Sequence, residues 1–187
     1  RSCRLSTLSY PSGFVEKFVY NTSGYLSQIQ DNASGAALWT ANTADAELHL
    51  KAQTAGNNVV TTASYDPQTG NLLSICASTP VIGCAVAHFT YQWDTIGNLI
   101  SRQNPSQPYT ENFCYDGLNR VENYALGANC TASGTTTVVY SDIGNITEKS
   151  DVCAAANCFA YEGTGGAGPH ALTKIYGTYN GVSNPTF

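Results

Sequence analysis

The chain has 187 residues, of which 42% are hydrophobic and 11% are charged, and its formal net charge is −5. This acidic balance excludes a basic surface for nucleic acid. No apolar run approaches the about 18 residues of a membrane span. The hydrophobic content argues against disorder, while low charge and 17 Gly favour a β protein rich in turns. No signal peptide is visible, and a start at Arg1 leaves room for an upstream segment.

Five segments share one pattern, in which an aromatic residue precedes a short polar turn and then an aliphatic residue. In chain order they are Tyr20 to Leu26, Tyr65 to Leu72, Trp93 to Leu99, Tyr115 to Val121 and Tyr140 to Ile146. Asp or Asn opens most of the turns, where its side chain accepts backbone hydrogen bonds. Gly closes them, and Asn119 takes that place in the fourth, because both residues tolerate positive φ.

Alternating residues ahead of these turns predict strands, because side chains two residues apart lie on one face of a strand. The alternating sets are Phe18/Tyr20, Phe89/Tyr91/Trp93, Phe113/Tyr115, Val138/Tyr140 and Phe159/Tyr161. Return strands are expected to start at Leu72, Leu99, Val121 and Ile146. Each unit therefore reads as a β-hairpin, with tips near Asp66–Gly70, Asp94–Gly97, Asp116–Asn119 and Asp142–Gly144.

The least regular stretch is 31–58, within the 45 residues that separate Tyr20 from Tyr65. This gap has room for an extra, degenerate hairpin. Two segments could form either short helices or strands, and we favour strands: Ala36 to Trp39 and Ala44 to Leu50. The second segment is then expected to place Glu47, His49 and Lys51 on one face, and Ala46, Leu48 and Leu50 on the other.

The units resemble the YD-repeat, or Rhs-repeat, family, whose core is Tyr-Asp, a few variable residues, Gly, Asn or Arg, and an aliphatic residue. Tyr65 to Leu72 and Tyr115 to Val121 carry this core, and Tyr10 to Phe14 and Gly166 to Thr173 resemble recurrent family phrases. Three positions depart from the family core: Trp93 replaces Tyr, Asn21 replaces Asp, and Ser141 is inserted before Asp142.

The resemblance extends over essentially the whole chain. It implies an all-β fold, an antiparallel meander of about six hairpins wound as a β-spiral, in a single array over 1–187. The repeat anchors are Tyr20, Tyr65, Asp66, Gly70, Trp93, Asp94, Gly97, Tyr115, Asp116, Tyr140 and Gly144. The anchors read either as an exposed row that stacks on glycans or as the packing core between hairpins, and we favour the core.

The seven cysteines indicate the cellular compartment in which the protein folds. Three pairs bracket short loops and are expected to form disulfides: Cys76–Cys84, Cys114–Cys130 and Cys153–Cys158. Each closure contributes about 2–3 kcal/mol on the chain-entropy model. Disulfides imply an oxidising setting, which is extracellular, cell-surface or periplasmic; the alternative is reduced, buried cysteines in the cytosol. Cys3 is left over, and its partner is expected upstream.

No residue pattern points to catalysis. His49, His88 and His170 are scattered, and no cysteine or histidine spacing fits a zinc site. The Gly-rich segment Gly163 to Gly168 is followed by Pro169 rather than a Lys-Ser or Lys-Thr pair, so a phosphate loop is not expected. The sequence therefore predicts a protein that is not an enzyme, without catalytic residues, metal or cofactor.

In the family, the YD-repeat sheet closes into a shell that encloses a toxic C-terminal domain, or serves cell-surface contact in teneurin-like proteins. The resemblance thus implies a scaffold segment of a large secreted or surface protein, whose partners are other YD repeats and an enclosed toxin domain. Two alternatives are a fibre subunit that stacks through sheet edges and a carbohydrate-binding adhesion module. Uncharged edge strands are expected at Leu5 to Tyr10 and Ile175 to Val182.

Overall fold

A computed structural model describes residues 4–79, 82–107, 109–153, 155–161 and 168–187. Within these ranges the regular structure is entirely β-strand, which confirms the predicted fold class. None of the described residues forms a helix, so none belongs to a helix long and apolar enough to cross a membrane. Cys3, and the part of the Gly-rich segment from Gly163 to Ala167, lie outside the described residues.

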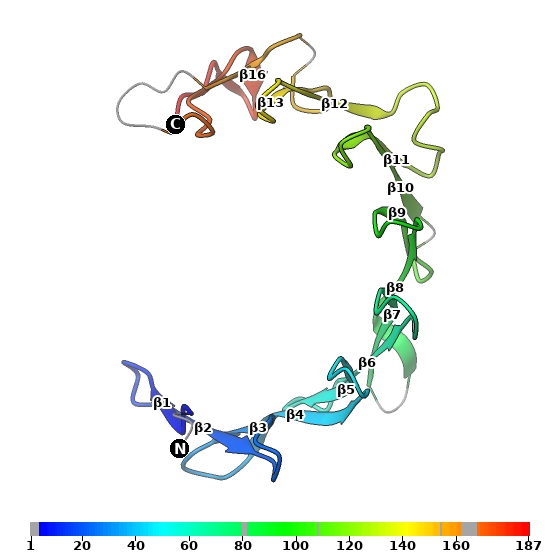
Figure 1. Cartoon of the computed structure of the whole chain (residues 1–187). Coiled ribbons are helices and arrows are strands. Elements are labelled where there is room, and N and C mark those ends of the chain that lie inside the picture. The colour runs from blue at the N-terminus through cyan, green and yellow to red at the C-terminus, as the bar shows by residue number, and fades with distance from the viewer. Residues whose placement is uncertain (1–3, 80–81, 108, 154, 162–167) are drawn as a thin grey trace. The chain divides into compact units, whose positions relative to one another are not determined.

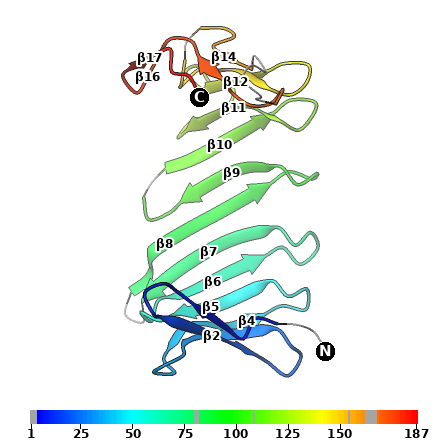
Figure 2. The ribbon, with the colours of Figure 1, turned by 90° about the vertical axis from the view of Figure 1, so that its left-hand side faces the viewer.

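Thirteen strands, β1 to β13, follow one another in a single antiparallel sheet in the order of the sequence. Strand neighbours in the sheet are thus neighbours in the chain, as Figure 1 and Figure 2 show. Two compact units divide the chain: 1–92 with 103–108, and 93–102 with 109–187. The single array over 1–187 stays a prediction.

The first unit contains seven complete strands and most of an eighth. They are β1 (Thr7–Ser9), β2 (Val15–Tyr20), β3 (Leu26–Asp31), β4 (Ala37–Ala44), β5 (Leu50–Ala55), β6 (Val60–Tyr65), β7 (Leu72–Thr79) and β8 (Ile82–Trp93). The repeat turns lie at one end of the strands, and the remaining connections lie at the opposite end (Figure 2). The meander is therefore a row of hairpins in register.

The second unit contains most of β9 (Leu99–Asn104), followed by the rest of the sheet and two small sheets. Its other strands in the large sheet are β10 (Tyr109–Tyr115), β11 (Val121–Leu126), β12 (Thr136–Tyr140) and β13 (Ile146–Lys149). The small sheets pair β14 (Phe159–Ala160) with β15 (Lys174–Ile175), and β16 (Thr178–Tyr179) with β17 (Val182–Ser183).

The C-terminal segment differs from the expected free edge strand. Ile175 to Val182 is broken at Gly177, whose φ of 107° ends β15, and the chain then turns into the β16–β17 hairpin. The Ile175 amide donates to the Pro185 carbonyl, and Lys174 bridges Thr186. The segment therefore satisfies much of its backbone internally, so the prediction of an unpaired edge here is wrong.

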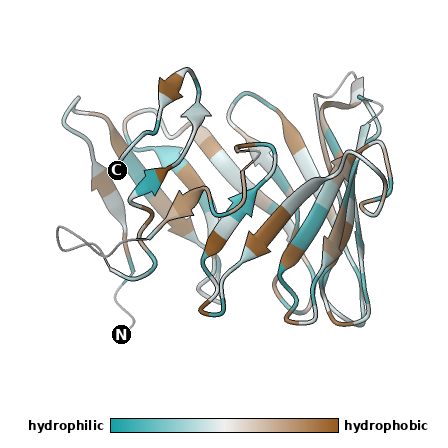
Figure 3. Ribbon diagram, turned by 90° about the horizontal axis from the view of Figure 1, so that it is seen from above, coloured by the Kyte–Doolittle hydropathy of each residue, from teal (hydrophilic) through white to brown (hydrophobic). Residues whose placement is uncertain are grey.

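The sheet is thin, and few of its side chains are fully enclosed. Among the described residues, the buried side chains are Ala77, Cys130, Val138, Cys158, Ile175 and the polar Asn145. Hydrophobic and hydrophilic residues alternate along many strands, while several hairpin tips carry hydrophobic residues (Figure 3). Contacts between neighbouring hairpins must therefore supply much of the stability that a thick core gives a globular domain.

Candidate functional site

The repeat turns are built around the side chain of their first residue, and five share one backbone pattern, while the Asp66 turn is one residue longer. In the β8–β9 turn, Oδ1 of Asp94 accepts hydrogen bonds from the Ile96 amide at 3.0 Å and the Asn98 amide at 2.8 Å. In the β10–β11 turn, Oδ1 of Asp116 accepts from the Leu118 and Arg120 amides. These are the Asx turns that the sequence pattern predicts.

Two other turns carry the same feature at positions where the sequence is less regular. Asn21 accepts from the Tyr25 amide at 2.9 Å through its Oδ1. In the turn after β12, Oγ of Ser141 accepts from the Asn145 amide at 3.1 Å. Ser141 therefore takes the place of Asp rather than being an insertion, and the turn begins one residue earlier than predicted.

A sixth repeat turn lies at Asp45 to His49, between β4 and β5. Oδ1 of Asp45 accepts from the Glu47 and His49 amides, and Leu48 holds a positive φ of 69° where other units have Gly or Asn. The segment was expected to alternate as a strand, and this part of the prediction is wrong. The strands β4 and β5 on either side agree with the favoured interpretation.

Hydrogen bonds in these turns lower the pKa of their carboxyl groups. The Thr69 amide, followed by the Gln68 amide and the Thr69 hydroxyl, holds the pKa of Asp66 below its ordinary value. The pKa of Asp116 is lowered chiefly by the Arg120 amide and then by the Arg120 side chain. Nη2 of Arg120 lies 2.7 Å from Oδ2 of Asp116. The turns therefore prefer the ionised carboxylate.

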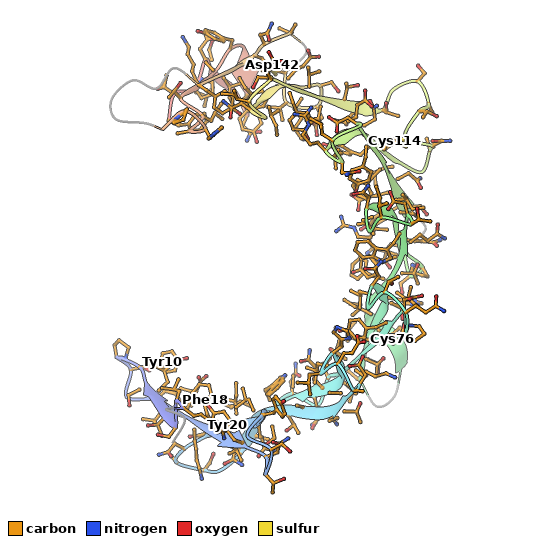
Figure 4. All side chains as sticks on the ribbon, in the orientation of Figure 1. Tyr10, Phe18, Tyr20, Cys76, Cys114 and Asp142 are labelled. Atoms are coloured by element: carbon orange, nitrogen blue, oxygen red, sulfur yellow. A yellow bond between two sulfur atoms is a disulfide. The ribbon has the colours of Figure 1, made fainter. Side chains whose placement is uncertain are left out.

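Each tyrosine anchor fastens its hairpin to the one before it. The anchor ends the strand ahead of a turn. Its hydroxyl donates to the main-chain carbonyl of the first residue of the preceding strand or, for Tyr20, of a residue two positions ahead of that strand. The pairs are Tyr20 to Leu5 at 2.8 Å, Tyr65 to Leu50 at 3.4 Å, Tyr115 to Leu99 at 2.8 Å and Tyr140 to Val121 at 2.9 Å. Figure 4 marks Tyr20 at the end of β2.

A shift in strand register accompanies four of these anchors and aims their side chains. The pairing slips between Val19 and Tyr20, and equivalent shifts occur immediately before Tyr65, Tyr115 and Tyr140. Such β-bulges turn a side chain away from its ordinary direction on the strand. The anchors consequently reach along the sheet to the preceding hairpin.

A cation or ring from a residue just ahead of the preceding strand covers the anchor in three units. The Arg4 guanidinium lies 5.4 Å from the Tyr20 ring centre, and the Arg120 guanidinium lies 4.4 Å from that of Tyr140. The His49 ring stacks on Tyr65 at 4.7 Å. The covering residue always directly precedes the residue whose carbonyl accepts the hydroxyl. Each contact of this kind contributes about 0.5–1 kcal/mol when partly exposed.

These contacts make the anchors part of the packing between hairpins. Tyr20, Tyr65, Trp93, Tyr115 and Tyr140 are all half-buried. Burial, and then the Asp94 carboxylate, raise the pKa of Tyr115, so that its hydroxyl stays a donor at neutral pH. The interpretation as a row of freely exposed rings does not fit this arrangement.

Three disulfides join Cys76 to Cys84, Cys114 to Cys130, and Cys153 to Cys158. These are the pairs that the sequence leads us to expect. The second fastens the long β11–β12 connection alongside β10, where the Gly127 amide donates to Thr110 and the Asn112 side chain donates to Ala128. Cys76 and Cys114 are marked in Figure 4. The first bond thus joins the neighbouring strands β7 and β8, and the third lies within the connection between β13 and β14.

The described residues contain no group of three His, Cys, Asp or Glu side chains placed to hold a metal ion. His49 hydrogen-bonds to Asp45 and stacks on Tyr65, and Nδ1 of His170 lies 2.6 Å from Oδ1 of Asn145. Both histidines thus have structural partners. The repeated turn with its anchor is the feature from which a function can be argued.

The sequence analysis missed two parts of this site. Ala44 occupies the anchor position of the sixth turn, and nothing in a lone alanine indicates it. The covering of the anchors by Arg4, His49 and Arg120 was the other; the available signal was their shared position directly before an aliphatic residue, Leu5, Leu50 or Val121.

Comparison with known proteins rests on structure alone, because no protein-family model and no curated protein matches the chain. The chain is similar to the crystal structure of TcdB2-TccC3-TEV, with a TM-score of 0.64 and 20% identity over 82% of its length. It is also similar to TcdB2-TccC3-Cdc42, with a TM-score of 0.62 and 20% identity over 75%.

A third similar structure is TcdB2-TccC3 without its hypervariable C-terminal region, with a TM-score of 0.55 and 15% identity over 95% of this chain. The chain covers 9%, 8% and 12% of these three proteins, respectively. At this level of identity the likeness shows a shared fold. The antiparallel hairpin meander thus exists as a small part of much longer chains.

Proposed function

We propose that the chain is a non-enzymatic scaffold segment of a YD-repeat shell. The observation that carries the proposal is the recurrence of one arrangement in four of the six units, in which a polar turn residue shapes the turn and a tyrosine hydroxyl joins the hairpin to the previous one. Such an arrangement adds hairpins one after another without a limit on length, because each unit contacts only its neighbours.

The solved structures support this proposal in a second way. The chain is similar to a small share of TcdB2-TccC3, and one of those structures lacks a hypervariable C-terminal region. In the YD-repeat family such a shell encloses a toxic C-terminal domain. The partners of this chain are then other YD repeats on both sides, and an enclosed toxin domain in the same parent protein.

Three disulfides support a secreted, cell-surface or periplasmic setting for that parent protein. The experiment that tests the scaffold function is sequencing of the reading frame on both sides of this segment. We expect further Tyr-Asp hairpin units and a C-terminal domain of unrelated composition. A frame in which 1–187 is flanked by unrelated domains, without further repeats, would contradict the proposal.

A second candidate, a fibre subunit, is favoured by the N-terminal edge of the sheet. The strand β1 pairs only with β2, and its residues Thr7, Leu8 and Ser9 are all exposed. An uncharged strand edge of this kind is a template for another strand. Growth into a fibre requires heterologous pairing, of β1 with a different surface of the next copy, because pairing of β1 with β1 of a second copy closes into a dimer.

Light scattering at increasing concentration tests the fibre candidate. Fibre growth predicts masses well above 19.8 kDa, suppressed by Leu8→Lys on the edge strand. The matched control is Leu118→Lys, which places the same charge on an exposed repeat turn away from that edge. A concentration-independent monomer excludes the fibre and leaves the scaffold function standing.

A further inference from the structure

One repeat turn lacks its anchor ring. Ala44 ends β4 directly before the Asp45 turn, and the strand register shifts between Thr43 and Ala44 as it does before the tyrosine anchors. The position is therefore equivalent to Tyr20, Tyr65, Tyr115 and Tyr140 in backbone geometry. A methyl group stands where these units place a phenol ring.

A hollow of about 390 Å³ lies at this place, within the first unit. Apolar and aromatic side chains dominate its lining: Tyr25, Leu26, Trp39, Ala44, Leu48 and Leu50. Tyr25 is 52% exposed and Leu48 is 53% exposed, so neither side chain has folded over to fill the space. The Trp39 ring is held in place by a 2.8 Å hydrogen bond from Nε1 to Oε1 of Gln53.

The next hairpin shows what fits such a place. There the Tyr65 ring stacks on His49, and its hydroxyl donates to the carbonyl of Leu50, the residue after His49. One hairpin earlier, the corresponding residues are Tyr25, which follows the turn glycine, and Leu26, which starts β3. A ring in the hollow would stack on Tyr25 and donate its hydroxyl to the Leu26 carbonyl.

We propose that the hollow at Ala44 is a binding site for a phenolic ring. The apolar lining supplies contact area, the Tyr25 face supplies stacking, and the Leu26 carbonyl selects a hydroxyl over a bare aromatic ring. The ligand chemistry is that of phenol itself, which a free phenol or a tyrosine side chain of a peptide can present. This binding function goes beyond the scaffold function and does not depend on it.

Ligand-observed NMR on the whole 187-residue protein tests the site, with phenol, benzene and N-acetyltyrosinamide as probes. We expect saturable binding of phenol with a dissociation constant on the order of 1 mM, as suits so small a ligand. Benzene is expected to bind about tenfold more weakly, because it lacks the hydroxyl hydrogen bond. Binding of N-acetyltyrosinamide identifies a peptide tyrosine as the source, whereas its exclusion identifies a free phenol.

Ala44→Tyr is the decisive variant, because it supplies the missing anchor and occupies the hollow. It should abolish phenol binding, whereas Ala85→Tyr, at an exposed strand position of β8 in the same unit, should bind as the unchanged protein does. Tyr25→Ala leaves the hollow open and should weaken phenol severalfold through lost stacking. Unchanged binding in a folded Ala44→Tyr protein, equal affinity for benzene, or absence of phenol binding to the unchanged protein would overturn the proposal.

Discussion

At the residue scale, the tyrosine hydroxyl is the group that distinguishes an anchor from an ordinary aromatic residue. Four hydroxyls donate to carbonyls of the preceding hairpin, at distances from 2.8 to 3.4 Å. Deleting one leaves the ring, its stacking and its buried area in place. The effect of such a deletion therefore isolates the link between hairpins from the general hydrophobic contribution.

Tyr115→Phe should lower the free energy of unfolding by about 1 kcal/mol, because the Leu99 carbonyl loses its donor. Urea denaturation followed by circular dichroism measures the change. The control is Tyr109→Phe on the same strand, whose side chain is 39% exposed and whose hydroxyl has no hydrogen-bond partner within the described part of the chain. Equal effects in the two variants would show that the anchor hydroxyl contributes nothing.

The acidic turns should make stability depend on pH. Because the folded protein holds the pKa of Asp66 below its ordinary value of 3.8, the carboxylate contributes stability above that value. The contribution is lost as the pH falls through the lower, folded-state pKa. Asp66→Asn keeps the accepting oxygen but cannot titrate, so its stability should approach that of the unchanged protein as the pH falls through 3.8 and below.

Thermal melting at several pH values measures this convergence. Asp142→Asn is the control, because the Asp142 carboxylate, marked in Figure 4, makes no hydrogen bond to the described residues. Its melting curve should run parallel to that of the unchanged protein over the same range. A constant offset between Asp66→Asn and the unchanged protein would contradict a role for ionisation in that turn.

At the element scale, the hairpins could be predicted where polar turn and aromatic anchor occur together. Turns at Asp66, Asp94 and Asp116 lie where the sequence pattern places them, because an Asx residue followed three or four residues later by a positive-φ residue determines the local backbone. The Asp45 turn was missed, since Leu48 replaces Gly and Ala44 replaces the ring. There, pairing with the neighbouring strands overrides the weak local signal.

The longer connections were beyond sequence reasoning for a different reason. The β11–β12 loop is held against β10 by the Cys114–Cys130 disulfide. Beside it, the Gly127–Thr110 and Asn112–Ala128 hydrogen bonds determine which backbone groups of the loop contact the strand. Spacing alone indicates the cysteine pair. It does not indicate the path of the chain between them.

Disulfide connectivity is the element-scale prediction. Non-reducing peptide mapping should recover Cys76–Cys84, Cys114–Cys130 and Cys153–Cys158. The paired change Cys114→Ser and Cys130→Ser should cost about 2–3 kcal/mol, because it frees a closed loop in the unfolded chain. Crossed pairs would contradict the connectivity, and six free thiols in native protein would contradict both the connectivity and the oxidising compartment.

At the scale of the whole molecule, a sheet with few buried side chains depends for its stability on contacts between neighbouring hairpins. A chain of hairpins joined by repeated anchors suits a shell, because each added unit extends the sheet by the same contacts. The likeness to TcdB2-TccC3 shows a shared fold, and the chain covers 9% and 12% of two of those structures.

Electron cryomicroscopy of the full product of the gene that carries this segment tests the scaffold function most directly. We expect residues 4–149 to lie in a longer array of antiparallel hairpins, with further repeats paired to β1 and a separate domain inside the enclosed space. The Tyr65, Tyr115 and Tyr140 hydroxyls should contact Leu50, Leu99 and Val121 as they do here. A product in which β1 has no added strand and no space is enclosed would contradict the shell function.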